Sequence, residues 1–339
     1  MLMVASIPVV DIAPYFGGAE AAKRAVARQI DEACTALGFL IISGHPVPER
    51  LIEEMRRVSR AFFDLPREEK LRLKMPPDRY RGYIGLGDEA LSYSLGETSP
   101  PDWKESFSIG PFNTPDDAYH RAARPGHFFA PNLWPERPAD FRSVWEAYFS
   151  AMERLSTDLM RLFALGLGMD EHFFDDKVDH HITNFSVIHY PEQAKAPLPG
   201  QLRAGAHTDY GSLTIVKPDA APGGLQVRGK DGAWIDVPVI PGTFVVNLGD
   251  LMAEWTNDRW VSTLHRVVNP PRDQALGSRR LSMTFFHQPN YDAVIECLPT
   301  CTGPGRPPRY GRTTSGEHVW AKVNKHRTPG LDERKVAGA

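Results

Sequence analysis

Residues 213–247 read LTIVKPDAAPGGLQVRGKDGAWIDVPVIPGTFVVN, and this stretch decides the fold class. Short runs of apolar and β-branched residues are separated by Pro- and Gly-rich turn signals, which is typical of successive β-strands. The stretch predicts strands at Leu213–Val216, Leu225–Val227, Trp234–Val237 and Thr243–Asn247. Further candidates flank it at Thr183–Tyr190, Ser262–Val268 and Leu281–Phe286. Many short strands at this spacing predict a sandwich or barrel of jelly-roll type.

The first half of the chain has helical periodicity instead. Apolar residues recur at helical spacing over Ala21–Leu37, Pro48–Phe63 and Arg137–Gly166, and Phe39–Ile42 is a short buried strand candidate. Because helices precede the strands rather than alternating with them, we expect an α+β fold with a jelly-roll core flanked by helices.

This change of pattern divides the chain into four parts of one integrated unit. We expect a helical or mixed region at 1–120, long buttressing helices at 121–180, the jelly-roll core at 181–300 and a C-terminal segment at 301–339. The chain of 339 residues, 42% of them hydrophobic, is long enough to bury a large core.

Charge and cysteine content narrow the class of protein. A formal net charge of −3, with both signs interspersed, argues against nucleic acid or an anionic membrane as the main partner. The chain shows no membrane span and no signal segment, and its three cysteines are too scattered for a disulfide framework or a zinc cluster. We expect a reduced, cytoplasmic protein, either monomer or homodimer.

A candidate metal site lies within the predicted β-region. His207 and Asp209 are two residues apart, so on a strand both side chains point to one face, and His265 comes from a separate strand. Two imidazoles and one carboxylate are the ligands of non-haem Fe(II) oxygenases, although a catalytic zinc site has the same ligand types. A pair of unrelated surface residues is the commoner explanation of His-x-Asp alone.

A candidate anion site follows in the sequence. Arg280 and Ser282 alternate along one strand, so they share a face, and Tyr190 supplies another hydroxyl from an earlier strand. A guanidinium and hydroxyls suit a carboxylate held at two points, and this arrangement favours iron over zinc. A buried arginine needs a partner, and an internal salt bridge would also satisfy it. Arg279 is expected to point outward.

Strand alternation also predicts the lining of a substrate pocket. The candidates are mixed polar and apolar and suit a small or medium-sized organic molecule: Asn184, Ser186, Ile188, Leu213, Thr284 and Phe286. Tyr93, Tyr210 and the loop Gly85–Asp102 are candidates for a lid, and a plain surface loop explains them equally well.

Several motifs occur together and in a fixed order along nearly the whole chain. They include Gly38-Phe39-Leu40-Ile41-Ile42, Arg81-Gly82-Tyr83, Lys104-Glu105-Ser106-Phe107, His189-Tyr190-Pro191, His207-Thr208-Asp209, Asn247-Leu248-Gly249-Asp250 and Arg280-Leu281-Ser282. In this respect the chain resembles the isopenicillin N synthase-like family of Fe(II)/2-oxoglutarate-dependent dioxygenases. One departure is Ile188, where many plant members carry Asn.

The resemblance implies that 1–120 is a non-catalytic region and that 181–300 is the catalytic core, a double-stranded β-helix. It also implies a set of cofactors. It implies Fe(II) on His207, Asp209 and His265, and 2-oxoglutarate with its far carboxylate on Arg280 and Ser282 and a hydrogen bond from Tyr190. It further implies O₂ as oxidant, ascorbate as a supporting reductant, and succinate and CO₂ as coproducts. Hydroxylation is the expected outcome, with desaturation and cyclisation as alternatives.

Two other functions fit the same residues. Isopenicillin N synthase itself is an oxidase that uses Fe(II) and O₂ without 2-oxoglutarate, and its Arg-x-Ser motif binds the substrate's own carboxylate. A non-catalytic jelly-roll protein that binds a ligand in the same pocket is the alternative from another class.

Overall fold

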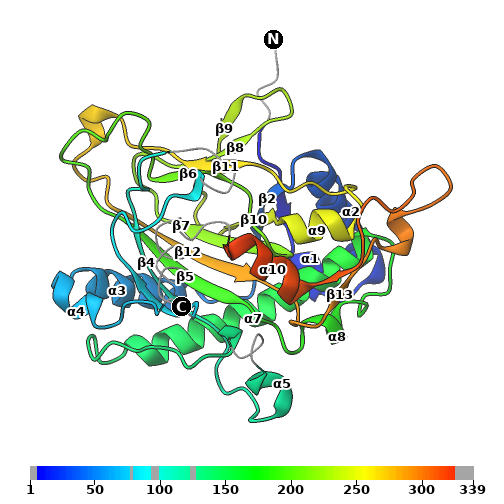
Figure 1. The fold of residues 1–339 in the computed structure, drawn as a ribbon. Coiled ribbons are helices and arrows are strands. Elements are labelled where there is room, and N and C mark those ends of the chain that lie inside the picture. The colour runs from blue at the N-terminus through cyan, green and yellow to red at the C-terminus, as the bar shows by residue number, and fades with distance from the viewer. Residues whose placement is uncertain (1–5, 77–78, 93–98, 123–126, 325–339) are drawn as a thin grey trace, which may run out of the picture.

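The computed structural model describes residues 6–76, 79–92, 99–122 and 127–324, in which two β-sheets face each other (Figure 1). Among these residues the larger sheet has eight strands, in the order β1 (Val9–Asp11), β2 (Phe39–Ser43), β10 (Phe244–Leu248), β7 (Leu213–Pro218), β12 (Arg280–His287), β5 (Asn184–Tyr190), β4 (Glu105–Ile109) and β3 (Gly82–Ile84). The smaller sheet has the order β6 (Ala204–His207), β11 (His265–Val267), β8 (Leu225–Arg228) and β9 (Trp234–Asp236). A hairpin of β13 (Val294–Ile295) and β14 (Thr313–Thr314) lies apart from both.

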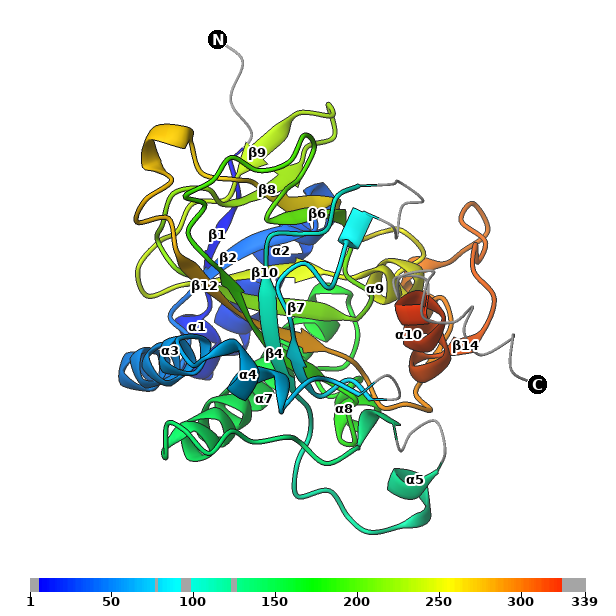
Figure 2. The same cartoon turned by 60° about the vertical axis from the view of Figure 1, so that its left-hand side comes forward.

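Helices cover the larger sheet on the side away from the smaller one (Figures 1 and 2). The longest is α7 (Phe141–Gly166), and α2 (Glu20–Ala36) and α3 (Glu49–Phe63) pack against it. The shorter helices are α1 (Ala13–Phe16), α4 (Arg67–Leu71), α5 (Ala118–Arg121), α8 (Asp175–Val178), α9 (Asp250–Trp255), α10 (Ser315–Asn324) and the 3₁₀ turns η2 (Arg272–Gln274) and η3 (Pro299–Cys301). Among the described helices, none is both long and apolar enough to cross a membrane.

Strand alternation gives the larger sheet two different faces. On the outer face, Phe185 of β5 packs on Trp145 of α7 at 5.1 Å between ring centroids, and Phe285 of β12 packs on Phe149 at 5.2 Å. The inner face is turned toward the smaller sheet, and its residues can line a site between the two sheets. Because each fully buried large apolar side chain contributes roughly 1.5–3 kcal/mol, the outer core holds the inner face in place.

The turn from α2 into β2 depends on a glycine. Gly38 has φ +67°, and a Cβ there would lie 2.0 Å from the carbonyl oxygen of Val261. A side chain would therefore clash with fixed backbone as well as strain the left-handed conformation. The helix expected over Ala21–Leu37 ends at Ala36, just before this turn.

The α+β jelly-roll prediction is confirmed, and most predicted strands are present within a residue or two. The segment 1–120, expected to be helical or mixed, contributes four strands to the larger sheet, of which only β2 was predicted. The missed strand β4 is buried at every position, and β6 consists of Ala, Gly, Ala and His. β4 alternates Ser, Phe, Ser and Ile but has only one β-branched residue, and β6 has none, so contacts with the neighbouring strands impose the conformation.

Candidate active site

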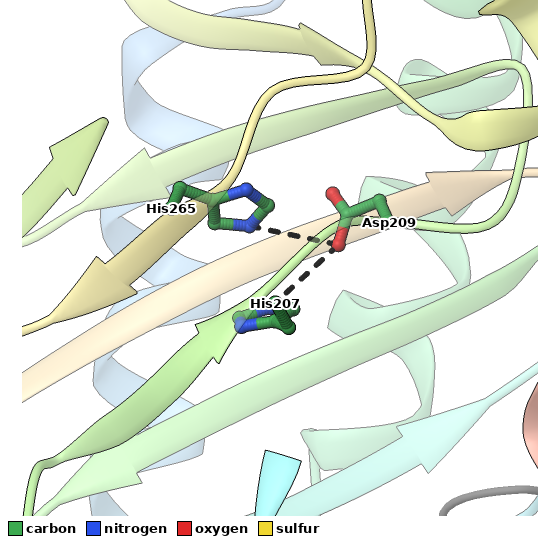
Figure 3. A group of neighbouring side chains, drawn as sticks. All are labelled: His207, Asp209 and His265. Carbon is green, nitrogen blue, oxygen red and sulfur yellow. Dashed lines mark ion pairs between the residues drawn. The ribbon is translucent and has the colours of Figure 1, made fainter. Parts of the chain in front are cut away.

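Three predicted ligands meet between the two sheets (Figure 3). His207 is the last residue of β6 and is paired directly with His265, the first residue of β11. The Oδ1 atom of Asp209 lies 3.8 Å from Nε2 of His207 and 3.7 Å from Nε2 of His265. One donor atom from each residue lies within 4.8 Å of the other two, a separation that allows all three to bind one ion. Asp209 reaches the centre from the loop after β6, not from the strand as expected.

Hydrogen bonds leave one nitrogen of each histidine free to bind a metal ion. Nδ1 of His207 lies 2.7 Å from the carbonyl oxygen of Gly205, and Nδ1 of His265 lies 3.1 Å from that of Thr263. A carbonyl oxygen only accepts, so both Nδ1 atoms carry the proton and both Nε2 atoms keep a lone pair.

The carboxylate of Asp209 is oriented in the same manner. Its Oδ2 accepts hydrogen bonds from Thr214 Oγ1 and Asn247 Nδ2, both at 2.7 Å, which leaves Oδ1 directed at the histidines. Thr214 and Asn247 are direct neighbours on β7 and β10.

The protonation states of His207 and Asp209 favour the binding of a metal cation. Burial and the nearby His265 lower the pKa of His207 to about 3. Burial alone would raise the pKa of Asp209, but His265, His207 and the hydrogen bonds from Thr214 and Asn247 lower it overall. A neutral imidazole beside a charged carboxylate is the form that binds a metal, so these residues fit Fe(II).

The predicted anion site assembles beside the metal ligands. Arg280 pairs with Tyr190 and Ser282 with Ile188 across β12 and β5, so Arg280, Ser282 and Tyr190 share the inner face. The Arg280 side chain is buried, and Cζ lies 5.8 Å from the centre of the Tyr190 ring.

Arg280 has no internal salt bridge among the residues that the structure describes. Its Nη1 donates to the carbonyl oxygen of Gly223 at 2.8 Å, and its Nε has no hydrogen-bond partner there. Burial lowers the pKa of Arg280, which reflects the cost of an unpaired buried guanidinium. Arg279, by contrast, points to the opposite face, where it binds Asp64 at 2.7 Å and His189 at 2.8 Å.

Comparisons with known proteins agree with this geometry. Residues 180–289 match the model of the 2OG-Fe(II) oxygenase superfamily, and residues 7–137 match that of the N-terminal region of the non-haem dioxygenase in morphine synthesis. The 2-oxoglutarate-Fe(II) type oxidoreductase hxnY of Emericella nidulans is 34% identical, over 92% of this chain and 88% of the relative. The chain belongs to the 2OG-Fe(II) oxygenase superfamily.

Other relatives of the oxygenase extend the comparison. A homoarginine-6-hydroxylase of Oryza sativa is 35% identical, over 94% of this chain and 96% of its own length. The crystal structure of a full-length Neurospora crassa protein in complex with alpha-KG superimposes with a TM-score of 0.82 at 33% identity and covers 94% of this chain and 95% of that one. This likeness confirms the double-stranded β-helix and favours a cosubstrate-dependent enzyme over the oxidase and the binding protein.

Five of the six predicted pocket residues share the inner face of the oxygenase. Thr284 pairs with Ser186, Phe286 with Asn184, and Ser282 with Ile188. The structure corrects the prediction for Leu213, which lies on the outer face in the core against the helices. Across β7 and β12, the residue opposite Phe286 is Thr214, so the inner position is one residue further along than predicted.

Two charged residues beside the site were not predicted from the sequence. Asp102 accepts hydrogen bonds from the backbone nitrogens of Gly205 at 2.9 Å and Leu91 at 3.1 Å, which ties the loop after β3 to the strand that carries His207. Lys104 is almost fully buried and pairs with Glu89 at 2.7 Å. The alternation of Ser106, Phe107, Ser108 and Ile109 on β4, which begins one residue after Lys104, was the available signal, but this strand was not predicted.

The predicted lid is only partly placed. Tyr93 lies outside the described residues, and the base of the loop Gly85–Asp102 is held by the Asp102 contacts. Tyr210 follows the ligand Asp209 in the sequence, and its carbonyl oxygen accepts a hydrogen bond from the backbone nitrogen of Leu251 in α9. The C-terminal segment also reaches this region, since Asp250 accepts from Thr208 at 3.2 Å and from Lys322 of α10 at 2.6 Å.

Proposed function

We propose that the oxygenase hydroxylates a small or medium-sized organic molecule, with Fe(II) on His207, Asp209 and His265. The observation that carries this proposal is the single free donor atom that each residue directs to one point. Bound iron and 2-oxoglutarate supply the O₂ chemistry, in which the cosubstrate becomes succinate and CO₂. The name homoarginine-6-hydroxylase, carried by several relatives, favours hydroxylation over desaturation or cyclisation.

The protein binds the far carboxylate of 2-oxoglutarate through Arg280, Ser282 and Tyr190. Arg280 brings a desolvated guanidinium that lacks an acidic partner among the described residues, and a ligand carboxylate supplies one. Ser282 lies on the same face of β12 as Arg280, so its hydroxyl is placed to donate to the same carboxylate. Fixing this end of the cosubstrate orients its keto-acid end toward the metal ligands.

The substrate lies on the metal side of the same face. Phe286 and Asn184 are half-buried and opposite each other, and Ser186 with Thr284 continues the surface. An aromatic ring and an amide beside the centre can orient a C–H bond and exclude water from it. The pair Lys104–Glu89 adds charged groups at the edge of this region.

Anaerobic spectroscopy tests the assignment. We expect a visible absorption band when 2-oxoglutarate is added to the Fe(II)-loaded protein, and a metabolite library should reveal the substrate by its change in that band. Asp209→Ala should show no band while keeping its fold. Oxygen consumption that ignores 2-oxoglutarate and yields no succinate would establish the oxidase instead, and a failure to bind Fe(II) would establish a binding protein.

A further inference from the structure

Arg280 forms part of the wall of a cavity of about 550 Å³. Its walls are mostly apolar and come from both sheets and the segments after them: Pro218, Leu225, Val237, Val239, Val268 and Pro270. The volume is far above the ~30 Å³ that one water molecule occupies in the liquid, so it can receive a displaced side chain.

The cavity lies on the far side of Arg280 from the metal ligands. On β7, Thr214 contacts Asp209 at one end, whereas Pro218 at the other end lines the cavity. On the smaller sheet, β11 begins with the ligand His265, and Val268 just past its end lines the cavity. The order along both sheets is therefore metal centre, anion site, cavity.

Arg280 is held forward by one hydrogen bond and by the Tyr190 ring, 5.8 Å from its Cζ. Within the described part of the chain its side chain makes one hydrogen bond, from Nη1 to Gly223, and Nε is buried without a partner. Gly224 leaves the adjacent side open: a Cβ there would lie 3.5 Å from Nη1 of Arg280 and would meet no other atom within 4 Å. The long arginine side chain can thus withdraw toward the cavity without breaking an ion pair.

We propose that the oxygenase also accepts a 2-oxo dicarboxylic acid one methylene longer than 2-oxoglutarate, namely 2-oxoadipate. This inference rests on the proposed function, in which Arg280 binds the far carboxylate. One methylene lengthens an extended chain by roughly 1.3 Å, from a C–C bond of about 1.5 Å and a near-tetrahedral angle. Withdrawal of the guanidinium by that distance keeps its contact with the carboxylate, while the keto-acid end stays in place.

The chemistry balances as it does for 2-oxoglutarate. The C1–C2 bond of 2-oxoadipate breaks, C1 leaves as CO₂, and the remainder becomes glutarate. One oxygen atom of O₂ enters the new carboxylate of glutarate and the other enters the substrate C–H bond as a hydroxyl group. O₂ gains four electrons, two from the keto acid and two from the substrate.

Calorimetry on the full chain loaded with Mn(II) measures binding without turnover. We expect the Kd of 2-oxoadipate to be at most about tenfold higher than the Kd of 2-oxoglutarate, which corresponds to ~1.4 kcal/mol of binding free energy. With Fe(II) and O₂, glutarate should form from 2-oxoadipate. Binding weaker by more than about a hundredfold, with 2-oxoglutarate bound normally, would overturn the inference and leave the proposed function intact. A failure to bind either acid would overturn both.

Two variants test the role of the cavity. Gly224→Ala supports Arg280 from behind, and Ala221→Phe fills the cavity from its own wall. Each variant should raise the Kd of 2-oxoadipate about tenfold more than it raises the Kd of 2-oxoglutarate. The Kd of 2-oxoglutarate itself should stay within about twofold of the wild-type value. Gly305→Ala is the matched control, because a Cβ there meets nothing within 4 Å and Gly305 does not line the cavity. An unchanged ratio of the two Kd values in both test variants would refute the withdrawal of Arg280.

Discussion

Thr214→Val should weaken iron binding although Thr214 is not a ligand. The hydroxyl of Thr214 donates to Oδ2 of Asp209 at 2.7 Å, and valine replaces threonine with nearly the same shape. Asp209 and Thr214 are both buried, so no water from bulk solvent takes the place of the lost donor. The substitution therefore removes one hydrogen bond to the ligand carboxylate and little else.

The size of the effect follows from the partners that remain. A hydrogen bond to a charged group is worth roughly 1.5–3 kcal/mol, and partners that orient metal ligands typically change metal affinity by about 10–100-fold. Asn247 still donates to the same Oδ2 atom at 2.7 Å, so the carboxylate keeps part of its orientation. We therefore expect the affinity for Fe(II) to fall about tenfold, near the lower end of this range, which corresponds to ~1.4 kcal/mol of binding free energy.

Anaerobic titration with Fe(II) measures this loss, and Mn(II) provides a second readout. Thr214→Ser restores the hydroxyl and should recover most of the affinity. Thr157→Val is the matched control, since the Thr157 hydroxyl donates only to the carbonyl oxygen of Glu153 within α7. Equal metal affinity in wild type and Thr214→Val, with both proteins folded, would refute the idea that Thr214 fixes the ligand atom of Asp209.

Three further outcomes are expected. His207→Ala and Asp209→Ala should abolish succinate formation with little change in Tm, and full activity in His265→Ala would contradict the metal assignment. Arg280→Ala should raise the KM for 2-oxoglutarate about 10–150-fold, because a charge-assisted contact is worth roughly 1.5–3 kcal/mol. An unchanged KM would contradict the role of Arg280 in binding the cosubstrate carboxylate. Glu105→Gln should lower the free energy of unfolding at neutral pH. Burial alone would raise the pKa of Glu105, but its hydrogen-bond donors outweigh burial and lower the pKa from 4.5 to about 2. The ionised Glu105 carboxylate therefore adds to the free energy of unfolding above pH 4.5, and this contribution is lost as the pH falls toward 2. Urea unfolding at pH 7 and pH 3 should show the difference between wild type and Glu105→Gln narrowing, and a constant difference would oppose this.

The sequence predicted the parts of the site that strand alternation controls. Arg280, Ser282 and Tyr190 share a face because side chains alternate along β12 and β5, and local pattern was enough to find both strands. Leu213 was misplaced because alternation gives two faces without saying which one is inner. That choice depends on the register between β7 and β12, which is a property of the folded sheet.

Contacts between distant segments could not be predicted from local pattern. Asn247 reaches Asp209 across a sequence separation of 38, and Asp102 reaches Gly205 across 103. Both contacts form only in the folded chain, where segments far apart in the sequence come together. Strand β4 was missed because three of its five residues, Glu105, Ser106 and Ser108, are polar yet buried. The cost of burying Glu105 is offset by partners elsewhere in the fold, among them Lys70.

The residues behind the anion site fix the register on which that site depends. His189 and Arg279 adjoin Tyr190 and Arg280 in sequence but point to the opposite face, where Arg279 Nε donates to His189 Nε2 at 2.8 Å. Nδ1 of His189 in turn donates to Glu105 at 2.7 Å, so the ring is neutral and both its nitrogens are engaged. Burial lowers the pKa of His189, which keeps this arrangement at neutral pH.

A slip of β12 that moved Arg280 to the place of Leu281 would turn Arg280 outward and Arg279 inward. It would break the bond between Arg279 and His189 and place the Arg280 guanidinium among the apolar residues that pack on the helices. The polar network on the outer face therefore selects the register that directs Arg280 and Ser282 inward. The position of the anion site in this oxygenase thus depends on a buried acid, Glu105, that never faces the cosubstrate.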